Sequence, residues 1–401
     1  MNSVNSRSAA LLTILGVSSC TWPQASKPTH SVRSAFKPQP TAITLAKSAW
    51  PKRHHDLRNT SRSPLAGPAK GKVIWRTLIS PNHGSHVDSS PVVDSLGNIY
   101  VGSQDRNLYS LSPEGRIRWR LLTDQWILRS SPLISSAGIV YQPSEDGYLH
   151  AVNTQRALQW RWNLGLGSPD TSPSVGTDGA ILIGNDRRDG LPVDTEESTL
   201  FALSGDGRPK WSRRVEGRQY ACPAVGTDGR IYITSTRVLS CFDAKGAPLW
   251  TAPVASWESP VIMDGGNLLV AAEHEGPLVS LRPDGSAAWK VGMKSSTTPA
   301  LASDGTIYVG RDDGLRAVTP TGHVKWHRCR GLIATGHALS VDKYDNVYAG
   351  FSRGWVYSLD KNGRTRWRLK LNMEATGSPP VIGAPGRIYL GGMDKYLYAI
   401  E

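Results

Sequence analysis

The chain has few cysteines and no long apolar segment. Four cysteines occur in 401 residues, and no run of 18 or more apolar residues is present, which excludes a transmembrane helix. With Cys20 set aside, three cysteines remain, so at least one thiol of an exported protein has no partner. Cys222 and Cys241 should lie on strands about 9–10 Å apart, beyond the Cα separation of about 7 Å that a disulfide tolerates. We therefore expect packed free thiols.

Acidic residues are scarce near the N-terminus, and this scarcity accounts for most of the net charge. The first 72 residues contain eleven Lys or Arg and one acid, Asp56, so they carry ten of the thirteen net positive charges. The remaining residues carry only three, which is too few for a nucleic-acid-binding body. No Ser-His-Asp order, metal-ligand cluster or phosphate loop is evident. The expectation is therefore no catalytic residue, no metal site and no cofactor.

The first 20 residues are typical of an exported bacterial protein. Arg7 precedes a short apolar core, and Val17-Ser18-Ser19-Cys20 is similar to a bacterial lipobox, in which the Cys is lipidated. A secretory signal cut nearby, with an incidental Cys20, is the alternative. The predicted location is the bacterial cell envelope, on the periplasmic side of the outer membrane with the lipid as the only membrane anchor, or otherwise outside the cell.

Two further segments precede the body of the chain. Residues 21–49 are rich in Pro, Ser and Thr and poor in large apolar groups, a composition that predicts a disordered tether. Residues 50–70 should pack against the body. His54 and His55 lie in this second segment, and adjacent side chains of an extended chain point in opposite directions. We therefore expect surface histidines and no shared metal.

Tryptophan, with 14 copies against four of phenylalanine, marks an internal repeat. Eight Trp follow one another at gaps of 37–51 residues, and a Gly lies four residues before seven of them. In the third copy Arg156 takes the place of that Gly. Self-similarity at such a period indicates a repeat architecture. The eight residues, predicted to dock one unit on the next, are Trp75, Trp119, Trp160, Trp211, Trp250, Trp289, Trp326 and Trp367.

Each copy contains four short β-rich runs joined by Gly or Asp-Gly turns, which is the period of a propeller blade. We predict an all-β fold over residues 71–401, an eight-bladed propeller of four-stranded antiparallel blades. The last copy ends at Glu401 without its outer strand, so residues 71–76 should pair with it and close the ring. A Pro recurs at the start of the first strand, and because Pro lacks an N–H it marks the inner edge. These positions are Pro91, Pro132, Pro173, Pro223, Pro260, Pro299 and Pro380, with Ala338 in the seventh copy.

The repeat resembles the pyrroloquinoline-quinone-like (PQQ-like) repeat family of eight-bladed propellers. Its tryptophan-docking motif, Ala-x-Asp-x-x-Thr-Gly-x-x-x-Trp, is matched in part by residues 151–160, 202–211, 317–326 and 358–367. The quinoprotein dehydrogenases of this superfamily carry adjacent cysteines and calcium ligands, and this chain has no Cys-Cys pair. The resemblance therefore implies the non-catalytic branch, similar to the lipoprotein B subunit of the outer-membrane β-barrel assembly machinery.

One face of the predicted ring carries the longer and more varied loops, and functional residues concentrate on such loops. We expect a monomeric, non-catalytic scaffold that binds another envelope protein or an extended polymer there. The alternatives are a PQQ-dependent or other quinoprotein-like dehydrogenase, and a propeller that binds surface polysaccharide. An enzyme would need clustered ionisable residues with shifted pKa values at the channel mouth. The candidate binding residues are Trp126, Arg129, Asp170, Tyr220, Trp257, Glu258 and His337.

Overall fold

The computed structural model describes most of the chain beyond residue 40. The described residues are 41–81, 85–165, 167–168, 170–187, 197–273, 276–293, 295 and 297–401. The predicted export signal with Cys20, and residues 21–40 of the predicted tether, lie outside them. Among the described residues, no helix is long and apolar enough to cross a membrane.

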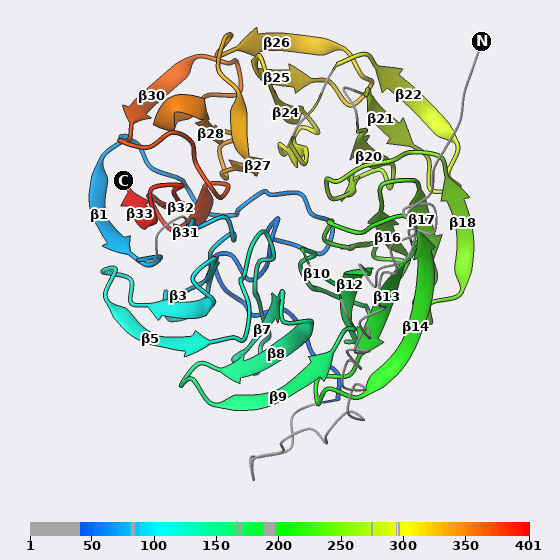
Figure 1. Cartoon of the computed structure of the whole chain (residues 1–401). Coiled ribbons are helices and arrows are strands. Elements are labelled where there is room, and N and C mark those ends of the chain that lie inside the picture. Colours follow the sequence, from blue (N-terminus) through cyan, green and yellow to red (C-terminus); the bar gives the residue numbers. More distant parts are fainter. Residues whose placement is uncertain are drawn as a thin grey trace, which may run out of the picture. The chain divides into compact units, whose positions relative to one another are not determined.

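The described chain forms eight antiparallel sheets of four strands each, with one additional short strand in the third (Figure 1). Blade 1 contains β2 (Val92–Val93), β3 (Ile99–Ser103), β4 (Asn107–Leu111) and β5 (Ile117–Leu122). Blade 2 contains β6 (Leu133–Ile134), β7 (Ile139–Ser144), β8 (Tyr148–Asn153) and β9 (Leu158–Asn163). Blade 3 contains β11 (Ser174–Val175), β12 (Ile181–Arg187), β13 (Glu197–Leu203) and β14 (Pro209–Glu216), with β10 (Gly167–Ser168) paired to β12. Blade 4 contains β15 (Ala224–Val225), β16 (Ile231–Thr234), β17 (Leu239–Phe242) and β18 (Pro248–Ala252).

The remaining four blades complete the ring. Blade 5 contains β19 (Val261–Ile262), β20 (Leu268–Ala271), β21 (Leu278–Leu281) and β22 (Ala287–Val291). Blade 6 contains β23 (Ala300–Leu301), β24 (Ile307–Arg311), β25 (Gly314–Val318) and β26 (Val324–Arg328). Blade 7 contains β27 (Ala334–Val341), β28 (Val347–Phe351), a 3-10 turn η2 (Ser352–Gly354), β29 (Trp355–Leu359) and β30 (Thr365–Lys370). Blade 8 contains β31 (Val381–Ala384), β32 (Arg387–Gly391), β33 (Tyr396–Ile400) and β1 (Val73–Leu78).

The ring closes as the sequence predicts, through the outer strand of blade 8. Strand β1 pairs antiparallel with β33, and Thr77 lies opposite Leu397. The backbone groups of Lys72 and Glu401 exchange two hydrogen bonds of 2.7 and 2.8 Å. Figure 1 shows β1 beside β33, and the strand begins and ends two residues later than the predicted 71–76. The eight-bladed propeller is therefore confirmed.

The repeated tryptophans join neighbouring blades, as expected. The indole of Trp160 lies on the turn of blade 3 at Gly207, whose φ is +83°, and a Cβ added there would lie 2.7 Å from the ring. Trp160 Nε1 also donates a hydrogen bond of 2.9 Å to Gly205 O. Trp75 lies on Gly115 in the same way, and Trp367 on Gly71 across the closure. Because only glycine leaves room for the ring and adopts this φ freely, the Gly-x-x-x-Trp spacing is a packing rule.

The inner strands meet around the axis, and a belt of backbone-to-hydroxyl hydrogen bonds links them. Ser90 N donates to Ser131 Oγ of the next blade at 2.9 Å, and Ser131 N donates to Ser172 Oγ at 2.9 Å. Cys222 N and Ser259 N continue the belt. Each donor directly precedes the repeated Pro. These small side chains therefore link neighbouring blades by hydrogen bonds. Cys222 and Cys241 are buried free thiols, as predicted, and Cys329 is a half-buried free thiol.

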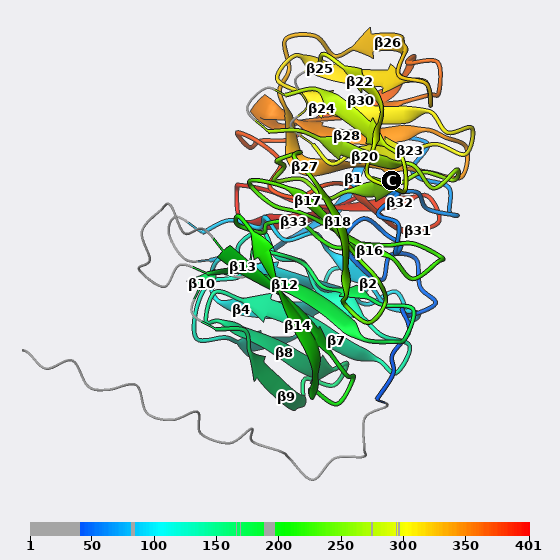
Figure 2. The same ribbon diagram turned by 90° about the vertical axis from the view of Figure 1, so that its right-hand side faces the viewer.

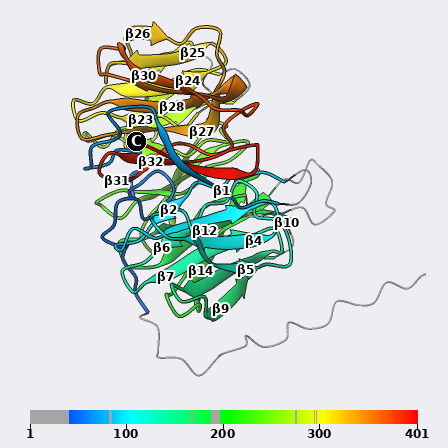
Figure 3. The same ribbon diagram turned by 90° about the vertical axis from the view of Figure 1, so that its left-hand side faces the viewer.

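Residues 41–66, here called the channel segment, cross the inner end of the ring. Their backbone carbonyls accept hydrogen bonds of 2.7–3.0 Å from the first strands of six blades. The carbonyls belong to Trp50, Pro51, Leu57, Arg58, Thr60 and Ser61, and the donors are Val93, Ile134, Val225, Ile262, Leu301 and Val341. Figure 1 shows this segment crossing the centre of the ring. Figures 2 and 3 show it on one face of the blades and β10 on the opposite face.

Two expectations for this region differ from the structure. His54 is buried, not at the surface, and bonds Ser61 Oγ at 3.3 Å and Ser259 Oγ at 3.1 Å. Both His54 and His55 have a positive φ, of 62° and 71°, so the chain turns here and is not extended. Residues 41–49 lie against the blades, where Ile43 N bonds Gly179 O at 3.0 Å. The composition of a tether did not reveal these contacts, because they are made mainly by the backbone.

The glycine rule predicts opposite effects at two equivalent turns. Gly207→Ala should lower the free energy of unfolding by roughly 2–4 kcal/mol, because it adds both backbone strain and a clash with Trp160. Arg156→Gly should raise it by up to about 1 kcal/mol, because Arg156 already occupies a φ of +78°. Denaturant unfolding of the two variants checks this. Equal effects of the two substitutions would contradict the docking rule.

Candidate functional site

The predicted binding residues lie where the chain enters the first strand of a blade. Arg129 precedes β6, Asp170 precedes β11, Glu258 precedes β19, and His337 lies within β27. The channel segment reaches these loops, because Arg53 Nη1 donates to Arg129 O at 2.7 Å. The region near the axis where the loops and the segment meet is here called the mouth. Because each incoming loop ends beside the axis, side chains far apart in the sequence meet there.

The centre of the site is a Glu–His pair. Glu258 Oε1 accepts from His337 Nδ1 at 3.2 Å, and Glu258 Oε2 accepts from Thr298 Oγ1 at 2.7 Å. Ser256 Oγ accepts the backbone N–H of Glu258 at 3.0 Å. The Glu258 side chain is 11% exposed, whereas the His337 side chain is 37% exposed. Burial alone would raise the pKa of Glu258, but the hydrogen bond and charge of His337 lower it below its usual value, helped by Arg53 and Thr298.

His337 holds an unusual backbone conformation. Its φ is +60°, which a residue with a Cβ rarely adopts. Strand β27 departs from regular pairing between Thr335 and Ser340, and this irregularity contains His337. The carbonyl of His337 accepts Thr298 N at 3.0 Å. Such strain costs about 1–3 kcal/mol and concentrates at functional sites, and here it aims an imidazole at Glu258.

The channel segment contributes a buried guanidinium. Arg53 is 7% exposed, its Nη1 donates to Arg129 O at 2.7 Å, and its Nε bonds His54 Nε2 at 3.2 Å. Burial lowers the pKa of Arg53, while the negative charges of Glu258 and Asp170 oppose that shift. Burial also lowers the pKa of His54, and the positive charge of Arg53 adds to this. The sequence analysis did not single out Arg53. Its position among eleven Lys or Arg residues with only one acid, Asp56, could have indicated it.

A second residue that sequence reasoning missed is Asp88. Gln104 Nε2 donates to Asp88 Oδ2 at 2.5 Å. Burial raises the pKa of Asp88, and His86, Gln104, Arg129 and His337 oppose this shift. Asp88 therefore belongs to the same electrostatic cluster as Arg129 and His337. It lies before the Ser of the repeat, and nothing in its local sequence separates it from the acids of ordinary turns.

The aromatic residues lie at the rim. Trp126 and Trp257 are 53% and 52% exposed, and the rings of Tyr220 and Trp257 are 5.8 Å apart. Within the described residues, no hydrogen bond or ring contact joins the Trp126 side chain to the other candidates. Asp170 is buried. The structure thus groups Arg129, Glu258 and His337 around the mouth, pairs Tyr220 with Trp257, and leaves Trp126 apart from them.

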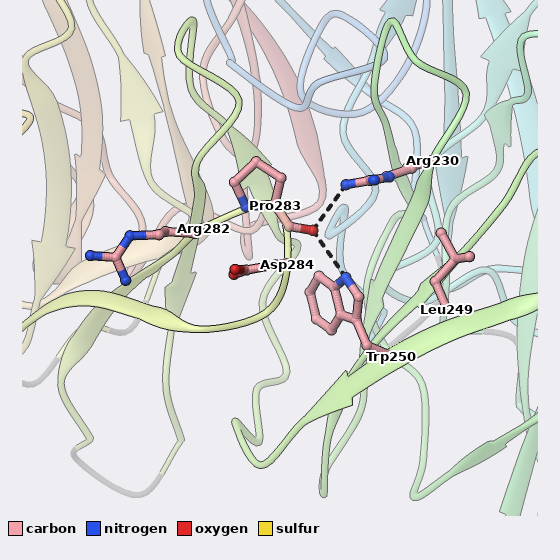
Figure 4. Close-up of a pocket in the computed structure, with 6 residues that line it drawn as sticks. All are labelled: Arg230, Leu249, Trp250, Arg282, Pro283 and Asp284. Carbon is pink, nitrogen blue, oxygen red and sulfur yellow. Dashed lines mark hydrogen bonds between the residues drawn. The ribbon is translucent and has the colours of Figure 1, made fainter.

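A pocket of about 610 Å³ at the outer rim belongs to a docking joint, not to this site (Figure 4). Trp250 Nε1 and Arg230 Nη1 both donate to Pro283 O at 3.0 Å. Trp250 is one of the eight repeated indoles, and the same indole-to-carbonyl contact recurs at other blades, such as Trp289 to Pro320 O. The pocket is therefore a consequence of the repeat.

The family model described as outer membrane protein assembly factor BamB matches residues 65–221 and 234–383. The chain belongs to this PQQ-like repeat family. No curated protein matches the chain. The match covers most of the blades and begins at residue 65, so Arg53 lies outside it.

Solved structures of the same fold include three enzymes. Quinohemoprotein alcohol dehydrogenase from Comamonas testosteroni is 13% identical, with a TM-score of 0.68 over 88% of this chain and 80% of that one. Quinohemoprotein alcohol dehydrogenase ADHIIG from Pseudomonas putida HK5 is 12% identical, with a TM-score of 0.71 over 91% and 83%. A europium-containing methanol dehydrogenase is 13% identical, with a TM-score of 0.65 over 86% and 90%.

These structures correct the main functional expectation. A non-catalytic protein-binding scaffold was predicted, with a quinoprotein-like dehydrogenase as the alternative, and the matched structures favour the alternative. At 12–13% identity they establish the fold alone, so chemistry must come from the site. The expectation had rested mainly on the absence of a Cys-Cys pair, a feature that does not bear on the fold shared with these structures.

The residues at the mouth can be tested against the two kinds of group that the names of these enzymes indicate, a metal ion and a quinone cofactor. A metal ion does not fit, because the described residues contain no group of three or more His, Cys, Asp or Glu that could hold one. A flat organic acid such as a carboxylated quinone fits better. Arg129 is exposed and its guanidinium makes no protein hydrogen bond within the described chain, while the Trp257 ring, which is also exposed, offers an aromatic face.

Glu258→Gln should make stability depend less on pH. The folded-state pKa of Glu258 is lowered, so its ionised form stabilises the fold above its ordinary pKa, about 4.3, and this contribution is lost as pH falls through the folded pKa. At pH 7 the variant should lose roughly 1–3 kcal/mol, and the difference should shrink as pH falls below the ordinary pKa and through the lowered folded-state pKa. Glu216→Gln, which breaks an exposed pair with Arg237, is the control and should cost less than about 1 kcal/mol. A pH-independent loss for Glu258→Gln would contradict the pairing.

Proposed function

We propose that the protein is an enzyme that oxidises a small hydroxyl-bearing molecule at the channel mouth, with His337 as the general base. The observation that supports this is the Glu258–His337 pair. Glu258 holds Nδ1, and Nε2 makes no protein hydrogen bond among the described residues. A carboxylate on one ring nitrogen fixes the imidazole so that the other nitrogen can accept a proton.

The environment of the pair suits proton transfer. Glu258 stays ionised at neutral pH because its pKa is lowered, so it stabilises the imidazolium that forms when His337 takes a proton. Thr298 donates to the second carboxylate oxygen and prevents it from rotating. The His337 side chain is partly exposed, so the proton can pass on to water. The three ionisable groups with shifted pKa values, Glu258, Asp88 and Arg53, are the cluster that an enzyme at the mouth requires.

Oxidation also needs an acceptor for electrons. Arg129 and Trp257 are the residues that would hold a flat carboxylated quinone, by charge-assisted hydrogen bonds and by stacking. Such a group, when bound, supplies the acceptor for the two electrons and the hydrogen that leave the substrate carbon. The names of the matched enzymes, which include alcohol and methanol dehydrogenases, agree with this class of reaction. The chain itself supplies the base and the binding groups.

The test is turnover of small alcohols with a dye as final electron acceptor, with and without added pyrroloquinoline quinone. His337→Asn should lower turnover by about 100-fold or more. The variant should still unfold at the same or a higher temperature, because Asn tolerates a positive φ and can still donate to Glu258. His323→Asn, at an exposed turn, is the control. Full activity in His337→Asn would rule out the proposed base, and no turnover of any alcohol by the wild type would rule out the reaction.

A further inference from the structure

Arg53 is a buried cation without an ion pair. No carboxylate lies within ion-pair distance of it among the described residues, although the side chain is 7% exposed. Arg is almost never fully buried unless it is paired, and an unmade hydrogen bond of a buried charge costs free energy. Its Nε and Nη1 have partners, His54 and Arg129 O, and its Nη2 makes no protein hydrogen bond in the described chain. The guanidinium thus retains an unused donor.

The nearby acids are committed elsewhere or act at longer range. Glu258, which has the largest electrostatic effect on Arg53 of any charged group, gives both carboxylate oxygens to His337 and Thr298. Asp170 also acts on Arg53, with a smaller effect, and no ion pair joins them. Arg129 adds a second positive charge close by. Arg53 Nη2 therefore remains without a protein acceptor in the described chain, and an anionic oxygen can accept this hydrogen bond.

The position of Arg53 is rigidly set. Lys52, fully buried, donates to Arg53 O at 2.7 Å, Asp56 O at 2.9 Å and Asn59 Oδ1 at 2.7 Å. Asn59 Nδ2 in turn donates to Cys222 O and Pro260 O at 3.0 Å each. These bonds fix the channel segment to blades 4 and 5, while Arg53 Nη1 reaches blade 2. A donor held in this way loses little entropy when it binds a ligand.

We infer that Arg53 binds the carboxylate of the substrate, so that the protein takes a small 2-hydroxy acid with its hydroxyl toward His337. A guanidinium matches a carboxylate in charge and in geometry. Glu258 links the two ends of this arrangement, because it bonds His337 and is the principal electrostatic partner of Arg53. The channel segment, which lies outside the blades, is thereby part of the substrate site. The choice of a hydroxyl-bearing substrate rests on the proposed oxidation. The binding of a carboxylate by Arg53 does not depend on it.

The experiment compares lactate with propane-1,2-diol, which differ in the carboxylate. The wild-type protein should oxidise lactate with a kcat/KM at least about 100-fold higher. Arg53→Gln should lower kcat/KM for lactate by about 100-fold and change that for the diol by less than about threefold. Arg53→Lys keeps the charge and should lose less. The matched control is Arg58→Gln in the same segment, whose guanidinium pairs with exposed Asp264 at 2.7 Å, and it should behave as wild type.

Binding of lactate, measured by titration calorimetry, separates the two proposals. Lactate that binds the wild type but not Arg53→Gln, without any turnover, would support the anion site and overturn the oxidation. Turnover of the diol with no preference for lactate would leave the oxidation standing and overturn the anion site. Neither binding nor turnover by the wild type would overturn both. Because the wild-type comparison needs no variant, it decides even where Arg53→Gln fails to fold.

Discussion

The propeller depends on an indole that lies on a glycine turn of the next blade. Each blade alone is a four-stranded sheet with two apolar faces, and it cannot bury both without neighbours. Trp160 on Gly207 and Trp75 on Gly115 are such contacts, and each indole buries about 150–250 Å². Trp367 on Gly71 carries the same contact across the chain ends. One local rule, repeated, therefore specifies a closed ring.

The inner side of the ring needs a different solution, because most first strands there are only two residues long. They pair with one neighbour in their own sheet and turn their other backbone groups toward the axis. The Ser and Thr belt satisfies some of these groups, and the carbonyls of the channel segment satisfy others. The same segment places Arg53 next to Arg129 and within electrostatic reach of Glu258 and Asp170. Stability of the inner edge and construction of the site thus share one segment.

The site itself combines strain with unbalanced charge. His337 has a positive φ inside an irregular strand, and Arg53 is buried without an ion pair. Both features cost stability and neither is needed to build a blade, since the other seven blades do without a His at this position. In a fold this regular, residues that depart from the repeat, such as His337, are better candidates for a functional site than residues that follow it. The match to the BamB-named model and the likeness to dehydrogenases agree on the blades. Neither comparison assigns a role to His337 or Arg53.

The sequence by itself determined the blades, their number, the closure by the N-terminal strand and the docking role of the eight Trp, because each rests on a short spacing repeated eight times. It also named Glu258, His337 and Arg129, since they depart from the consensus where the first strands begin. Only the tertiary structure decided that Glu258 and His337 form a pair, that Asp88 joins them, and that His54 is buried. It alone revealed Arg53, because the channel segment has no periodicity and is held by backbone hydrogen bonds to six blades, which no pattern of side chains records.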